Sequence, residues 1–202
     1  MGMPMEHLNE VIFLLLNAGP HASPMTVDVA RLLAEGAIWL VPLWLVLGWL
    51  RGSMAIRKVL LGAAVAGLAG LLLNQIIGLV WYHPRPFEAG IGRTLIKHAQ
   101  DSSFPSDHLT LIWAIAISLA LHQKTRLAGW SLALLGLPVA WARIYLGVHF
   151  PADMLGALLV GVLSAGFVRR IEGRIAEPLM GFLQPIYRKA CASLIRRGWS
   201  RE

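Results

Sequence analysis

Charged residues and cysteine are scarce in this chain. Only 14% of its 202 residues are charged, and Cys191 is the single cysteine. A soluble domain usually carries about 25% charged residues. One cysteine excludes a disulfide-rich secreted fold, and the apolar composition excludes a disordered chain. The glycines follow no period of three, which excludes a collagen-like chain. Instead, 56% of the residues are hydrophobic and the mean hydropathy is +0.62, so most of the chain must be kept from water.

Long uncharged runs predict five membrane-spanning helices. Residues 59–82 carry no charge, and this run is long enough to cross a hydrocarbon core of about 30 Å. Residues 30–50 form a second candidate. Three shorter runs, 109–121, 127–142 and 154–168, must borrow flanking residues or lie inside a bundle. We therefore expect a single all-α domain: a polytopic membrane helical bundle of about five transmembrane helices, without internal repeats.

Both ends of the chain are expected to lie on the membrane surface. The apolar stretch within residues 1–20 is too short to span and lacks the basic start and cleavage site of a signal peptide, which predicts an interfacial helix. Residues 171–202 are basic and amphipathic, which predicts a cytoplasmic tail attracted by anionic lipids. Residues 30–168 are then the transmembrane core.

The distribution of basic residues predicts the orientation. Eighteen lysines and arginines against eleven acidic residues give a formal net charge of +7, and 13 of the 18 lie within 51–58, 124–126 and 169–201. The positive-inside rule assigns these segments to the cytoplasm. Membrane orientation thus explains the charge, and we expect no nucleic-acid partner. The segments left on the outer side are 21–28, 83–108 and 143–153.

The outer segments hold side chains typical of phosphate binding. Ser106, Asp107 and His108 directly precede the third predicted span, so the free N–H groups of a helix N-terminus would face an anion there. Arg85 and Arg143, at the mouths of separate helices, supply planar donors that match phosphate oxygens. The sequence therefore predicts a phosphate cradle on the outer side.

Two histidines in these segments are suited to phosphoryl transfer. His149 and Asp153 are four residues apart, which places them on one face if the helix has begun by then. The carboxylate can hold one imidazole nitrogen as N–H and leave the other to attack phosphorus. His108 can protonate the leaving oxygen and later activate water. Two histidines with distinct partners are what a phosphoryl-transfer site without a metal would need, and we expect no cofactor.

Each of these residues also has a purely structural interpretation. Arg85 could be a snorkelling anchor, Ser106 an N-cap, and Asp107 a favourable charge at a helix start. Glu35, near the outer end of the first span, is either functional or paired with Arg31. The coincidence of three polar groups on one side of the membrane favours the functional interpretation.

Three elements of the sequence resemble the signature motifs of the type 2 phosphatidic acid phosphatase superfamily. They are Arg85-Pro86, Pro105-Ser106-x-His108, and the spacing of Arg143, His149 and Asp153. Within that superfamily, the forms Pro-Arg-Pro-Phe and Phe-Pro-Ser-Asp-His resemble the bacitracin-resistance type of undecaprenyl-pyrophosphate phosphatase. The likeness extends from about residue 11 to the end of the fifth predicted span.

The resemblance implies a metal-independent lipid phosphatase with a covalent phosphohistidine. It implies His149 as the nucleophile, Asp153 as its orienting carboxylate and His108 as the general acid. The groups that would hold the phosphoryl group are Arg85, Arg143, Ser106 and the backbone of Asp107. The implied substrate is a polyprenyl pyrophosphate, most simply undecaprenyl pyrophosphate, whose cleavage recycles the lipid carrier of cell-wall synthesis. The implied location is the bacterial inner (plasma) membrane, with the site facing the periplasm or cell exterior.

Three positions depart from the family pattern. The lysine seven residues before the first-motif arginine is Gly78 here, a glycine of the second motif is Asp107, and the serine before the third-motif arginine is Ala142. The missing lysine removes one phosphate contact; either Lys97 or Arg93 would replace it, or a second phosphate would be held differently. The secondary candidates for the site, for which solvated loop charge or packing is the alternative, are Pro86, Lys97, Arg93, His98 and Glu35.

Two other functions are compatible with the sequence. The same chemistry could act on another lipid, such as phosphatidylglycerophosphate, phosphatidic acid or a diacylglycerol pyrophosphate. A non-enzymatic transporter subunit for antibiotic export is the alternative of a different class. A transport path needs polar groups at mid-membrane, and Asn74 and Gln75 are the main candidates. The ionisable groups gather at one face instead, which ranks transport below catalysis.

Overall fold

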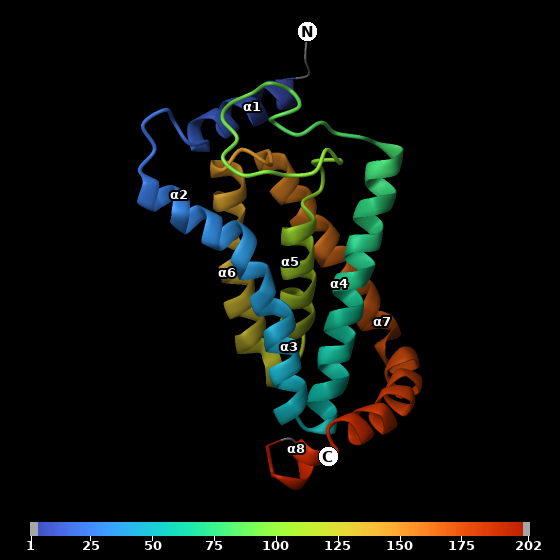
Figure 1. The fold of residues 1–202 in the computed structure, drawn as a ribbon. Coiled ribbons are helices and arrows are strands. Elements are labelled where there is room, and N and C mark those ends of the chain that lie inside the picture. Colours follow the sequence, from blue (N-terminus) through green and yellow to red (C-terminus); the bar gives the residue numbers. More distant parts are fainter. Residues whose placement is uncertain (1–3, 200–202) are drawn as a thin grey trace.

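The computed structural model describes residues 4–199, and every regular element in that range is helical. Its α-helices, in chain order, are α1 (Pro4–Leu16), α2 (Pro24–Arg31), α3 (Leu40–Arg51), α4 (Met54–Val80), α5 (Asp107–Ala120), α6 (Arg126–Tyr145), α7 (Pro151–Ala190) and α8 (Ala192–Arg196). A π-helical turn, Leu32–Gly36, and a 3₁₀ turn, Ala37–Trp39, join α2 to α3, and a second 3₁₀ turn, Gln123–Thr125, precedes α6. The long helices form one bundle, with loops at both ends (Figure 1).

Where the sequence predicts five spans, the described residues contain four helical segments that are long and apolar enough to cross a membrane: Pro24–Arg51, Met54–Val80, Gln123–Tyr145 and Pro151–Ala190. The remaining predicted span is α5, a shorter apolar helix of 14 residues. The first span begins at residue 24 instead of 30, because Pro24 follows Ser23 as a favourable first helical residue. Part of the predicted outer segment 21–28 is therefore helical.

Helix α5 is enclosed by its neighbours. It packs against α4, α6 and α7 (Figure 1), and most of its residues are buried. Glycines on α6 allow the close approach: a Cβ at Gly129 would lie 2.4 Å from the backbone nitrogen of Ala120, and one at Gly136 would lie 2.3 Å from Trp113 Nε1. Small residues at helix contacts are the usual means of packing membrane helices closely.

Helix α1 lies across the end of the bundle where the α4–α5 loop also lies (Figure 1). The Phe13 side chain is fully buried, with its ring centroid 5.1 Å from that of Phe150. The Asn9 side-chain oxygen accepts a hydrogen bond of 2.9 Å from the backbone N–H of Ala152. These contacts attach α1 to the start of α7. Its interfacial position stays a prediction, and residues 1–3 of that predicted segment lie outside the described residues.

Helix α7 continues far beyond the predicted fifth span. It runs to Ala190, curves round and ends with α8 at the opposite end of the bundle from α1 (Figure 1). The tail predicted from residue 171 is thus a continuation of the helix. It is attached to the start of α4 by Arg57, whose Nη2 donates a 2.8 Å hydrogen bond to the Tyr187 hydroxyl. Residues 200–202, including Arg201, lie outside the described residues.

Candidate active site

The predicted outer motifs meet at the end of the bundle that carries α1. The site is built from the loop between α4 and α5, the N-terminus of α5, the last turn of α6 and the start of α7. Each motif lies at or next to a helix end, where the backbone leaves the bundle. This geometry brings Arg85, Arg143, His149 and Asp153 together from separate segments.

His149 is bound through one ring nitrogen to Asp153. Its side chain is buried, and Nδ1 lies 3.0 Å from Asp153 Oδ2. The same carboxylate oxygen accepts a 2.8 Å bond from the backbone N–H of Phe150 and a bond from the Ser103 hydroxyl. A carboxylate only accepts, so the imidazole proton is on Nδ1.

The predicted proximity of His149 and Asp153 has a different cause from the one expected. Helix α7 begins at Pro151, so His149 precedes the helix and Asp153 is its third residue. The two side chains meet through the turn in which Asp153 accepts the Phe150 N–H, and not along one helical face. An acidic side chain near a helix start is also favoured by the helix dipole.

The other nitrogen of His149 faces two arginines. Nε2 lies 3.1 Å from Arg85 Nη1 and 3.3 Å from Arg143 Nη2. Because guanidinium groups only donate, Nε2 carries a lone pair. Burial and the charges of Arg143 and Arg85 hold the pKa of His149 well below its ordinary value, which keeps the ring neutral. The nitrogen available for attack thus lies where two cations would hold an anion.

Two buried donors near the arginines have no hydrogen-bond partner within residues 4–199. They are Arg143 Nε and the Ser106 hydroxyl. Ser106 is the N-cap residue of α5, but its side chain makes no capping hydrogen bond. A buried polar group without a partner costs about 1–3 kcal/mol. An anion with several acceptor oxygens would satisfy both groups, which agrees with the predicted phosphate cradle.

The Asp107 side chain is bonded to helix α4. Its carboxylate accepts a 2.8 Å hydrogen bond from Asn74 Nδ2 and a 3.2 Å bond from Gln75 Nε2. Asn74 also donates to Thr110 Oγ1 at 3.0 Å. Asn74 and Gln75, the mid-membrane polar residues that a transport path would need, therefore attach α4 to the N-terminus of α5. This removes the main sequence argument for a transport path.

A hollow of about 520 Å³ adjoins the arginines between the first span and α5. Its polar lining comprises Glu35, Lys97, His98, His108 and Arg143. Its apolar lining comprises Ile38, Trp39, Pro42, Ile96 and Leu111. Glu35 lies in the π-helical turn, a feature that often marks functional sites. The hollow thus joins a cationic end to an apolar wall.

Two secondary candidates do not reach this hollow. The Arg93 side chain donates to the Gly19 carbonyl oxygen, and its backbone N–H donates to Asn17. Arg93 therefore fixes the loop to the segment after α1. Pro86 is buried in the turn after Arg85, where its carbonyl oxygen accepts from the backbone N–H of Ile91. Arg31 is not paired with Glu35 either, because its ion pair is with Asp28 at 3.8 Å.

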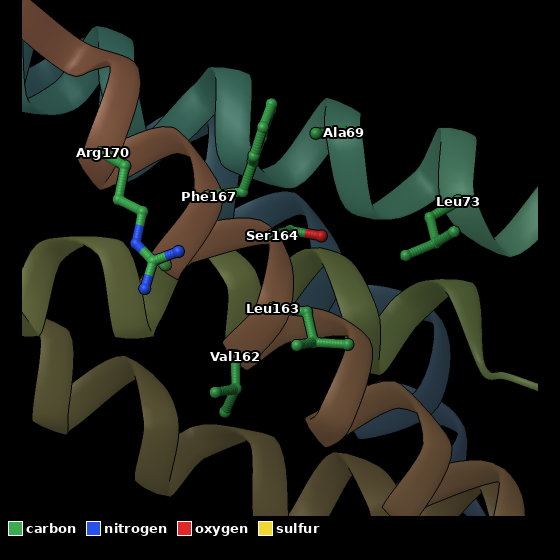
Figure 2. A pocket seen from close by; sticks show the side chains of 8 residues that line it. Ala69, Leu73, Val162, Leu163, Ser164, Phe167 and Arg170 are labelled. Carbon is green, nitrogen blue, oxygen red and sulfur yellow. The ribbon is translucent and has the colours of Figure 1, made fainter.

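A second hollow, of about 640 Å³, lies between α4 and α7 (Figure 2). Its labelled side chains are apolar except for Ser164 and Arg170. None of the predicted phosphate-binding residues lines it. Within residues 4–199, moreover, no three histidine, cysteine or acidic side chains converge as a possible metal site.

Sequence reasoning missed two residues of the site. Ser103 donates to Asp153, and Asp101 pairs with Arg85 Nη2 at 2.8 Å. Both lie in a polar loop stretch, Gln100 to Ser103, whose composition is that of an ordinary solvated loop. No spacing or periodicity in the sequence distinguishes them.

The chain is similar in sequence to a known family and to two named relatives, and similar in fold to a solved structure. Residues 56–176 match the family model described as the PAP2 superfamily. The chain is 37% identical to the "Putative undecaprenyl-diphosphatase YbjG" of Escherichia coli, covering 98% of this chain and 100% of that protein. It is 36% identical to the "Undecaprenyl-diphosphatase BcrC" of Bacillus subtilis, covering 94% and 97%. The fold resembles the crystal structure of Aquifex aeolicus LpxE, with a TM-score of 0.65 at 23% identity, covering 81% and 95%.

Proposed function

The chain belongs to the PAP2 superfamily, and on this premise we propose that it hydrolyses undecaprenyl pyrophosphate to undecaprenyl phosphate and inorganic phosphate. Two relatives that align with nearly the whole chain carry the name undecaprenyl-diphosphatase. The observation that carries the proposal is the state of His149: one nitrogen is bound to a carboxylate, and the other, unprotonated, faces two buried guanidinium groups.

The reaction proceeds in two steps. His149 Nε2 bonds to the terminal phosphorus while the bond from that phosphorus to the bridging oxygen breaks. His108 gives its proton to that oxygen of the departing lipid monophosphate. A water oxygen then bonds to that phosphorus while the bond from His149 Nε2 to phosphorus breaks, His108 accepts the proton of the water, and inorganic phosphate leaves. Arg85 and Arg143 stabilise the negative charge on the equatorial oxygens throughout. No step requires a metal.

The hollow beside the arginines suits the rest of this substrate. Lys97 lines it and has no hydrogen bond or ion pair within residues 4–199. Its ammonium is the cation proposed to bind the second phosphate, in place of the family lysine that is Gly78 here. The apolar wall formed by Ile38, Trp39 and Leu111 would accept the first part of the lipid chain.

The protein is a multi-pass membrane protein, and we propose the bacterial inner (plasma) membrane with the site facing outward. The basic segments lie at the end opposite the site, as the positive-inside rule requires for that orientation. The substrate would then be cleaved at the outer leaflet, with its chain remaining in the bilayer.

The test is phosphate release by the purified protein in detergent with a chelator present. Undecaprenyl pyrophosphate, phosphatidylglycerophosphate and phosphatidic acid are compared. We expect preference for the pyrophosphate and inhibition by vanadate, which mimics five-coordinate phosphorus. His149→Ala should lower turnover at least about a thousandfold, whereas His21→Ala, an exposed histidine on the same side, should leave it unchanged.

Other outcomes identify the alternatives. Preference for a glycerolipid would retain the mechanism and change the substrate. Phosphate release only with added Mg²⁺ would contradict the metal-independent mechanism. No release from any of the lipids would reject the enzyme and favour the transport hypothesis.

A further inference from the structure

One short loop segment contacts both phosphate-binding arginines. Residues 98–101 lie in the loop between α4 and α5 and carry His98 and Asp101. Asp101 is more than half exposed, while the Arg85 side chain it contacts is 4% exposed. His98 lines the hollow beside Arg143. The segment therefore covers the arginines from the outer side.

Asp101 fixes one edge of the Arg85 guanidinium. Its Oδ1 accepts from Arg85 Nε at 2.9 Å and from Nη2 at 2.8 Å. The backbone oxygens of Asp101 and Ser102 accept further bonds from the same edge, at 3.2 and 3.4 Å. Nη1 is left to donate to the Val148 carbonyl oxygen at 2.8 Å and to face His149 Nε2. A guanidinium bound along one edge presents its remaining nitrogen in a fixed direction.

His98 holds Arg143 in a similar way. Its Nε2 lies 2.8 Å from Arg143 Nη2. Arginine only donates, so Nε2 is the acceptor and the ring proton is on Nδ1. That nitrogen lies 3.2 Å from the Ala99 carbonyl oxygen and 3.7 Å from Asp101 Oδ1. Burial, together with the charges of Arg85 and Arg143, lowers the pKa of His98 and so favours this neutral form.

We propose that His98 and Asp101 are positioning residues that hold Arg143 and Arg85 against the reacting phosphate. This inference deepens the proposed function and rests on it. His98 acts as an acceptor for Arg143 and not as a proton donor to the substrate, because its only proton is directed away from the site. Asp101 acts through the charge and the two oriented bonds it gives to Arg85. The arginines then meet the phosphate without having to be reoriented, which is the usual benefit of preorganised donors.

The experiment measures vanadate affinity by calorimetry on the detergent-purified protein and four variants. His98→Ala and Asp101→Asn should each weaken vanadate binding about tenfold, as expected for loss of a bond to a charged group. His98→Gln should stay within about threefold of wild type, because its amide oxygen can accept from Arg143 in place of Nε2. Gln100→Ala is the matched control, an exposed residue of the same segment, and should bind as wild type does. Equal unfolding midpoints in the absence of vanadate would show that the variants are folded.

Three results would overturn the inference. They are unchanged affinity in both His98→Ala and Asp101→Asn, a His98→Gln variant as weak as His98→Ala, and an equal loss in Gln100→Ala. The wild-type assay for phosphate release distinguishes failure of the positioning inference from failure of the proposed function. If wild type hydrolyses the lipid while the variants bind vanadate normally, only the positioning inference fails. If wild type releases no phosphate, the proposed function fails, and the vanadate affinities still decide whether the segment positions the arginines.

Discussion

At the residue scale, the ionisation of His149 is the property on which the proposed chemistry depends. Burial is the largest cause of its lowered pKa, and Arg143 and Arg85 lower it further. An ordinary histidine has a pKa of about 6.5. As the pH falls below that value, the unfolded chain binds a proton at this residue that the folded chain does not. The contribution of His149 to the free energy of unfolding is therefore present above that pH and is lost as the pH falls towards the folded pKa.

We expect His149 to be neutral at pH 6, with its proton on Nδ1. Imidazole ¹⁵N NMR of the protein in detergent measures this directly, with the His149 signals assigned from their loss in His149→Gln. The exposed His21 is the internal control. A doubly protonated His149 at pH 6 would contradict the effect of burial and of the two arginines.

The sequence could predict only part of this site. Arg85, Ser106, His108, Arg143, His149 and Asp153 were predictable because each motif lies at or next to the end of a span, and spans in one bundle bring such ends together. Asp101 and Ser103 were not, because their positions depend on the path of a long loop, which leaves no periodic signal. Asp107 was only half predictable: its place at a helix start follows from the sequence, but its contact with Asn74 depends on the register of α4 against α5.

At the scale of elements, the apolar runs predicted four spanning helices and the shorter apolar helix α5, but not their boundaries. Arg31 and Glu35 interrupt the apolar pattern of the first span, although the helix runs through both. Arg31 is satisfied locally by Asp28 and by the Leu95 carbonyl oxygen, and Glu35 lies in a π-helical turn beside the hollow. The continuation of α7 was missed because a basic amphipathic segment appears the same in sequence whether or not it continues a preceding helix.

The packing of α5 against α6 gives a prediction for Gly129. A Cβ there would meet backbone atoms of α5, at 2.4 Å from Ala120 N and 2.6 Å from the Ala116 oxygen. Backbone cannot rotate away as a side chain can, so the helices must separate. Gly129→Ala should lower the free energy of unfolding by about 1–3 kcal/mol, read as a lower unfolding midpoint in detergent. Gly166→Ala is the control, because nothing lies within 4 Å of its Cβ position. Equal midpoints for the two variants would contradict this packing.

At the scale of the whole molecule, the two ends of the bundle differ in chemistry. One end carries the candidate site. The other carries the basic start of α4, held to α7 by the Arg57–Tyr187 hydrogen bond and a Lys58–Glu177 ion pair. Because the start of α4 and the C-terminal part of α7 are both basic and lie at this second end, the positive-inside rule predicts the same side of the membrane for both. The tail and the start of α4 should therefore lie on the same, cytoplasmic side of the membrane.

This orientation can be tested with the single natural cysteine. Cys191 follows α7 at the basic end and is partly exposed. A membrane-impermeant maleimide should leave it unlabelled in intact cells and label it once the membrane is permeabilised. The matched variant combines Cys191→Ser with Ala89→Cys, an exposed loop position at the site end, and should be labelled in intact cells. The opposite pattern would place the site in the cytoplasm, where a phosphatase of this geometry could not reach a lipid head group in the outer leaflet.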